Sequence, residues 1–175
     1  MNRTRRLALC AVMISLALVL SYTERFIPLQ MVIPLPGIKL GLANLVSLVA
    51  LYLLGGRSAY IILAIRCLMG SIFGGSVTAF LFSITGGTLA MLVMTGAMKA
   101  PFLSIYGVSI LGAAAHNIGQ ILAAMAVMQS VYIGAYLPYL LIVAVFTGLA
   151  TGTAASGVLR VLPPPETDIA GSSRR

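Results

Sequence analysis

Charged side chains are scarce in this sequence, and acidic ones are almost absent. Only 8% of its 175 residues are charged, whereas soluble domains carry roughly 25%. The acidic residues number three: Glu24, Glu166 and Asp168. None of them lies within a long apolar run, which excludes carboxylate proton relays and Mg²⁺–diphosphate chemistry at membrane depth.

Nucleotide and metal motifs are missing too. Without a Walker A sequence, the chain cannot drive a process by its own ATP hydrolysis. A single histidine cannot build a multi-histidine metal site, and two cysteines, Cys10 and Cys67, are too few for a disulfide scaffold. We therefore expect no metal, no cofactor and no enzymatic activity.

Apolar residues are what the sequence has in abundance. They make up 60% of the chain, and the mean hydropathy is +1.07. A bilayer core requires about 20 apolar residues per helix, and about 17 suffice. The sequence predicts an all-α integral membrane bundle, residues 1–162, with six transmembrane helices over 7–22, 38–54, 59–75, 77–97, 105–129 and 136–158.

The formal net charge of +8 sets the orientation of this bundle. The basic residues stand between apolar runs, which is typical of topology determinants and not of nucleic-acid binding. We expect both termini to be cytoplasmic, a first helix that is not cleaved as a signal peptide, a disordered cytoplasmic tail over 163–175, and a multi-pass protein of the plasma membrane. On the inner side this places Arg3, Arg5, Arg6, Arg57, Lys99, Arg160, Arg174 and Arg175, and on the outer side Arg25 and Lys39.

The longest loop, residues 23–37, is apolar and contains Pro28, Pro34 and Pro36. Three prolines forbid a continuous helix. A plain linker would be more polar, so we interpret the loop as a lid over an outward-facing cavity, with a linker as the alternative.

The richest polar cluster at membrane depth is His116, Asn117 and Gln120 in the fifth span. Their spacing of three and four residues places them on one helical face, which should look into the bundle. Such groups are costly in lipid. Ligand contact is the functional interpretation, and hydrogen bonding between helices is the structural one.

Three further residues are candidates for ligand binding. Arg66 either extends to the inner interface or is a buried cation that requires an anionic ligand or a partner subunit. Lys39 either anchors the second span at the outer interface or contacts a ligand. Asn44 lies deeper in that span and needs a hydrogen-bond partner. Hydroxyls of the fourth span, such as Ser83, are weaker candidates.

Two motifs resemble a known family. They are Pro34-Leu-Pro-Gly-Ile-Lys-Leu-Gly-Leu-Ala-Asn-Leu-Val with Ala50-Leu-Tyr-Leu-Leu-Gly, and His116-Asn-Ile-Gly-Gln120. They resemble the Gx transporter family, also labelled heptaprenyl diphosphate synthase component I, over roughly residues 5 to 162. That family in turn resembles the substrate-binding S components of energy-coupling-factor (ECF) transporters.

The resemblance implies a substrate-binding subunit of an importer for a small vitamin- or precursor-like molecule, and Arg66 favours an anionic one. The ligand would lie beneath the first loop. Energy would come from cytoplasmic ATPases through a transmembrane coupling subunit, which such proteins meet with an Ala-x-x-x-Ala seam on the first helix. Here the seam is Ala11-x-x-x-Ser15, which departs from that pattern at its second position.

Two alternatives stay open. The chain could be a non-catalytic membrane component of heptaprenyl diphosphate or quinone synthesis or of a membrane redox assembly. It cannot be the prenyltransferase itself, because its only aspartate is Asp168, in the tail. It could also be a self-contained facilitator or channel.

Overall fold

A computed structural model describes residues 3–26, 41–74 and 77–162 of the chain. These residues form six α-helices and two short 3-10 helices, and no strand occurs among them. The helices are α1 (Arg3–Thr23), α2 (Ala43–Leu54), α3 (Gly56–Gly74), α4 (Val77–Ala97), α5 (Ile105–Met128) and α6 (Leu137–Val161). The 3-10 helices are Glu24–Phe26, after α1, and Val131–Tyr136, which leads into α6.

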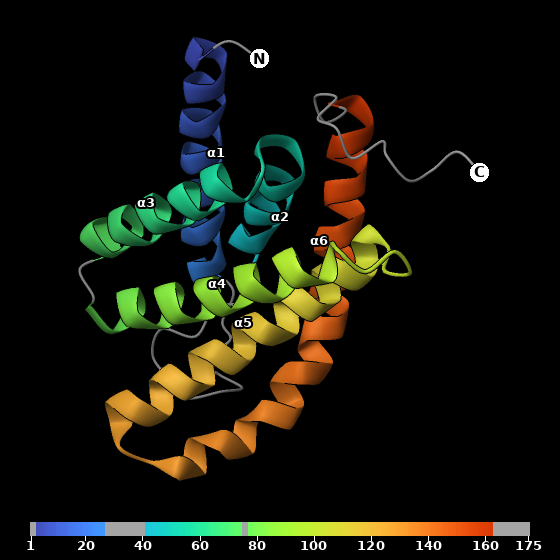
Figure 1. Ribbon diagram of the computed structural model, residues 1–175. Helices are drawn as coiled ribbons and strands as arrows, with labels where there is room; N and C mark the ends of the chain where they lie inside the picture. Colours follow the sequence, from blue (N-terminus) through green and yellow to red (C-terminus); the bar gives the residue numbers. More distant parts are fainter. Residues whose placement is uncertain (1–2, 27–40, 75–76, 163–175) are drawn as a thin grey trace.

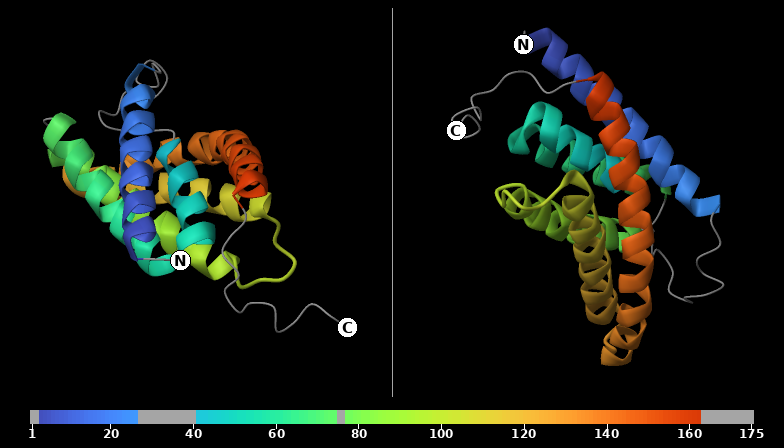
Figure 2. Two further views of the ribbon diagram at one scale, coloured as in Figure 1. Left: turned by 90° about the horizontal axis from the view of Figure 1, so that it is seen from above. Right: turned by 90° about the vertical axis from the view of Figure 1, so that its right-hand side faces the viewer.

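Five helices are arranged in an open series around α2. Going round it, α1 packs on α3, α3 on α4, α4 on α5 and α5 on α6, while α2 contacts all five. The first and last helices, α1 and α6, cross the layer formed by α3, α4 and α5 (Figures 1 and 2). Ten of the twelve residues of α2 are buried, so this short helix is the centre of the bundle.

The helix α2 is shorter than the sequence pattern predicts. We expected a span from residue 38, but α2 begins only at Ala43, because Gly41 has φ +85°, which a continuing helix does not allow. Twelve residues rise about 18 Å, against a hydrocarbon core of about 30 Å. The α2 N-terminus lies inside the bundle, where Ala43 and Asn44 are buried.

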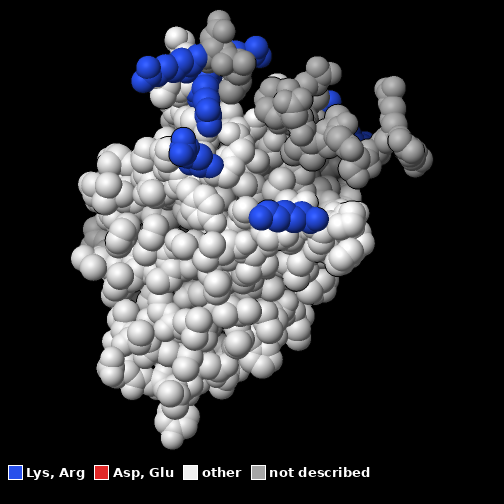
Figure 3. Space-filling model, viewed as in Figure 1, with Lys and Arg blue, Asp and Glu red and all other residues white. Residues whose placement is uncertain are grey.

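The C-terminal end of α2 is held at the basic end of the molecule. The guanidinium of Arg6 on α1 donates to the Ser58 hydroxyl at 2.6 Å and to the Leu54 carbonyl at 3.5 Å. A cation is favourable at the last carbonyls of a helix. In the view of Figure 3, the Lys and Arg side chains gather in the upper part of the molecule and the lower part carries none.

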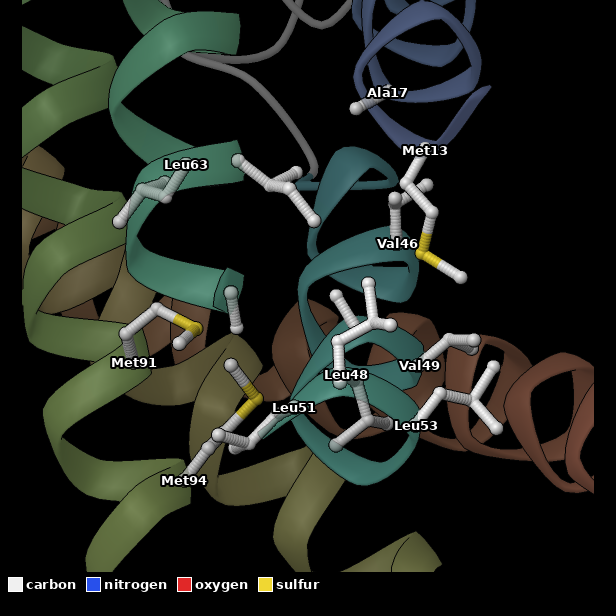
Figure 4. Close-up of a cluster of buried hydrophobic side chains, with 14 of the residues drawn as sticks. Met13, Ala17, Val46, Leu48, Val49, Leu51, Leu53, Leu63, Met91 and Met94 are labelled. Atoms are coloured by element: carbon white, nitrogen blue, oxygen red, sulfur yellow. The ribbon is translucent and has the colours of Figure 1, made fainter. Parts of the chain in front are cut away.

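Methionine, leucine and valine side chains from four helices fill the core around α2. Leu48 and Leu51 of α2 lie toward Met91 and Met94 of α4, and Val46 lies toward Met13 of α1 (Figure 4). Exposed large apolar residues cover the outside, among them Phe73, Leu92, Ile142 and Phe146. Within the described ranges, five helical segments are long and apolar enough to cross a membrane, and α2 is a shorter apolar helix.

Glycines bring α4, α5 and α6 into close contact. A methyl group on Gly119 of α5 would lie 2.7 Å from the Cα of Gly86 on α4, closer than real Cβ atoms approach. A methyl group on Gly148 of α6 would lie 2.6 Å from the Cα of Ile110 on α5. The Gly148-x-x-x-Gly152 motif therefore packs α6 against α5 within the chain, as is common for small-residue motifs in membranes.

Candidate functional site

Polar side chains converge on Gly86 and Gly87 in the middle of α4. His116 and Gln120 of α5 lie against the first of these glycines: a methyl group on Gly86 would stand 3.0 Å from His116 Nδ1 and from Gln120 Cγ. The two side chains are hydrogen-bonded to each other, with 3.0 Å between His116 Nε2 and Gln120 Nε2. Both are buried, at 3% and 0% exposure.

The first turn of α2 brings Asn44 to the same place. A methyl group on Gly41 would lie 3.0 Å from Asn44 Nδ2 and 3.1 Å from His116 Cδ2, so the amide and the imidazole flank one point. Gly41 is therefore required twice, for its positive φ and for the close approach of these two side chains. Asn44 is buried, and its Nδ2 has no acceptor in the described part of the chain.

Arg66 of α3 lies against the second glycine of the pair, Gly87. Its Nη2 donates to Asn44 Oδ1 at 3.4 Å and lies 3.4 Å from where a methyl group on Gly87 would stand. The side chain is only 6% exposed. Ten residues separate it from Gly56, the start of α3, which corresponds to about 15 Å. Of the two interpretations from sequence, Arg66 is the buried cation and does not extend to the basic end.

The charge of Arg66 is not paired with an acid in the described residues. Its Nη2 donates to the neutral Asn44, and its Nε has no acceptor there. The one acidic residue of the described ranges, Glu24, accepts a hydrogen bond from the Leu42 backbone N–H at the start of α2. Sequence analysis placed Glu24 in a loop outside the spans, yet its side chain is 5% exposed.

Asn117 does not join this cluster. Its Nδ2 donates to the Leu140 carbonyl on α6 at 2.8 Å, so it faces a different neighbour from His116 and Gln120. The three residues are all buried, as their spacing predicts. Only two of them approach the glycine pair of α4, and Asn117 makes the helix–helix hydrogen bond that was the structural alternative.

The other predicted positions lie at the periphery or outside the described residues. Lys39 and most of the first loop, including its expected role as a lid, fall outside the described ranges. Ala11 and Ser15 are exposed on α1, where the Ser15 hydroxyl donates to the Ala11 carbonyl at 3.1 Å. In α1 only Met13 and Ala17 are buried.

One part of the site was not apparent from the sequence as an arrangement. A small polar hollow of about 10 Å³ adjoins Arg66 and is lined by Ser21 of α1, Ser71 of α3 and Ser83 of α4, among others. Ser83 was a weaker candidate from the sequence, but Ser21 and Ser71 were not singled out, because single serines are common in apolar helices. Only the packing of α1, α3 and α4 shows that these three surround the same cation.

This fold and this cluster define a multi-pass helical membrane protein with a cation and several amides buried among its helices. A family model described as heptaprenyl diphosphate synthase component I matches residues 13–158, from α1 to α6. The chain belongs to this family, as the two sequence motifs indicate. No curated protein and no solved structure shows significant similarity to the chain.

Proposed function

We propose that this protein captures a small anionic ligand within the membrane and is the substrate-binding subunit of a multi-subunit importer. The observation that carries this proposal is the burial of Arg66 without an acidic partner in the described residues. An uncompensated charge in an apolar bundle is strongly unfavourable. An anion that binds beside Arg66 would supply the missing compensation.

The groups around Arg66 suit recognition of a polar ligand. Asn44, His116 and Gln120 come from two different helices and meet beside glycines that leave room for them. Ligand sites are commonly apolar and contain a few convergent polar groups of this kind. In this proposal Arg66 binds the anionic group, and the amides and the imidazole determine which ligand is accepted.

Transport by such a subunit depends on partners. The sequence contains no Walker A motif. Ala11 and Ser15 give α1 a small-residue surface, and this helix is largely exposed. In the proposal, a transmembrane coupling subunit packs on this surface of α1 and cytoplasmic ATPases supply the energy.

Binding by the purified protein tests the proposal. The protein would be reconstituted in phosphatidylcholine nanodiscs, and co-purifying small molecules would be identified by mass spectrometry after denaturation. We expect one anionic compound that is retained by the wild type and by Arg57→Gln, and lost from Arg66→Gln. Arg57 is the matched control because it is an exposed arginine on the same helix. Equal retention of the compound by both variants would show that Arg66 does not bind it.

The family name favours a second candidate function. It describes a component of heptaprenyl diphosphate synthase, so the chain could be a non-catalytic membrane subunit that recruits a soluble synthase. This alternative predicts that the catalytic synthase co-purifies with the protein in stoichiometric amounts. It also predicts that prenyl diphosphate formation by that synthase rises when the membrane protein is added, and that Arg66→Gln has no effect on the association.

A further inference from the structure

Two hollows meet between α1 and α3. The larger is an apolar groove of about 380 Å³ with walls that include Leu18, Val19 and Phe73. The smaller is the polar hollow of about 10 Å³ beside Arg66. Both are lined by Ser21 of α1 and Gly70 of α3, so the groove ends where the polar hollow begins.

The groove is suited to an apolar chain that comes from the bilayer. Val19 and Phe73 are 60% and 75% exposed, so the groove is open to the surroundings of the bundle, which in a membrane are lipid. At Gly70 there is no side chain to close it: a methyl group there would have only Leu18 Cδ2 nearby, at 3.8 Å. An apolar ligand can therefore pass along α3 as far as the serines.

The far end of the path is cationic. Arg66 is nine-tenths buried there, and its Nε donates to no acceptor in the described residues. A hollow of about 10 Å³ is about the size of one water molecule. One oxygen of an oxyanion fits beside the guanidinium, while the rest of a headgroup would stay at the junction near Ser21 and Gly70.

We infer that the ligand is an amphiphile, with an apolar chain in the α1–α3 groove and a phosphate or carboxylate headgroup at Arg66. This inference rests on the proposed function, because it names the class of anion that Arg66 binds. A hydrophilic anion at Arg66 would make no use of the apolar walls of this groove, whereas the chain of an amphiphile would contact them. The larger groove between α4 and α5, about 550 Å³, has no charged residue in its walls and lacks this combination.

The test compares four probes on the protein in phosphatidylcholine nanodiscs: farnesyl phosphate, dodecyl phosphate, farnesol and inorganic phosphate. We expect the two amphiphilic phosphates to bind at least about tenfold more tightly than farnesol or inorganic phosphate, because each of the latter lacks one half of the interaction. A preference for farnesyl over dodecyl phosphate would identify a prenyl ligand. Equal binding would identify a general lipid phosphate, and both results support an amphiphile.

Variants locate the binding. Arg66→Gln should reduce the affinity for both amphiphilic phosphates by about tenfold or more, as loss of a charged hydrogen bond does. Gly70→Leu should block the groove, and Val19→Trp blocks it from an exposed position if the glycine variant fails to fold. The controls are Arg57→Gln at an exposed cation and Leu122→Trp in the α4–α5 groove, which should bind like the wild type.

The outcomes separate this inference from the proposed function. Inorganic phosphate that binds as tightly as farnesyl phosphate, and depends on Arg66, overturns the amphiphile and leaves anion capture intact. Amphiphile binding that survives both groove-blocking variants overturns the assignment to the α1–α3 groove. If no probe binds folded wild-type protein that was stripped of co-purified compounds, the amphiphile is overturned, whereas the proposed function fails only if no anionic compound co-purifies in a manner that depends on Arg66.

Discussion

Arg66 Nη2 lies 3.4 Å from Asn44 Oδ1, and this contact joins the middle of α3 to the first turn of α2. A neutral amide satisfies one donor of the guanidinium but leaves its charge uncompensated. The same asparagine lies beside Gly41, against which the His116 ring also packs. The cation, the amide and the imidazole thus form one connected group at the centre of the bundle.

Replacing Arg66 by an uncharged residue should affect ligand binding and protein stability differently. We expect Arg66→Met to keep or raise the melting temperature, because it removes a buried charge while preserving much of the side-chain volume. Ligand binding should be lost in the same variant, as is common when a functional group costs stability. Thermal unfolding in nanodiscs, followed by circular dichroism, measures the first effect. A large fall in melting temperature would indicate that Arg66 is mainly structural.

The close contact of α4 and α5 depends on Gly119. We expect Gly119→Ala to destabilise the protein by about 1–3 kcal/mol, because the added methyl group would lie 2.7 Å from the Gly86 Cα, within the backbone of α4. The matched control is Gly96→Ala, also in a helix, where no atom lies within 4 Å of the added group. It should be neutral or stabilising by up to about 1 kcal/mol. Equal effects of the two substitutions would contradict the glycine contact.

Asn117 should behave as a structural residue. Its bond to the Leu140 carbonyl joins α5 to α6, and such bonds are worth about 0.6 kcal/mol on average in membranes. Asn117→Ala should therefore lower the melting temperature by a few degrees at most and leave ligand affinity within about twofold. His116→Ala should have the opposite profile, with affinity reduced more than stability. A loss of affinity in Asn117→Ala equal to that in His116→Ala would place both residues at the ligand.

The positions of the basic residues predict the topology. Six helices and the excess of positive charge at one end predict that both termini lie in the cytoplasm. Single cysteines at Arg5 and Arg160, in a background without Cys10 and Cys67, should react with a membrane-impermeant maleimide only after the cells are opened. A cysteine at Tyr132, which is 86% exposed at the opposite end of α5, should react in intact cells. The opposite pattern, with Arg5 and Arg160 positions labelled in intact cells and the Tyr132 position only in opened cells, would indicate the opposite orientation.

The long helices were predictable from the sequence, whereas the centre of the bundle was not. Runs of apolar residues suffice to predict the six helices of the bundle, although α2 is shorter than a membrane span. The late start of α2 depends on the positive φ of Gly41, and neither hydropathy nor spacing encodes a backbone angle. The same limit applies to Glu24, which looks like a loop residue but is buried against the start of α2.

The candidate site was predictable residue by residue but not as an arrangement. Helical spacing shows that His116, Asn117 and Gln120 are buried together, yet which neighbouring helix each one meets depends on packing between helices. Asn117 meets α6, and the other two meet α4. The polar hollow at Arg66 combines serines from three helices, and no pattern along a single helix can show that.

The central claim is that Arg66 binds the anionic group of a ligand. The most direct measurement is the affinity of farnesyl phosphate and of the co-purified compound for wild-type protein, Arg66→Gln and Arg57→Gln in phosphatidylcholine nanodiscs. The account predicts that Arg66→Gln reduces the affinity for whichever ligand binds by about tenfold or more and that Arg57→Gln leaves it unchanged. Equal affinity of all three proteins would contradict it.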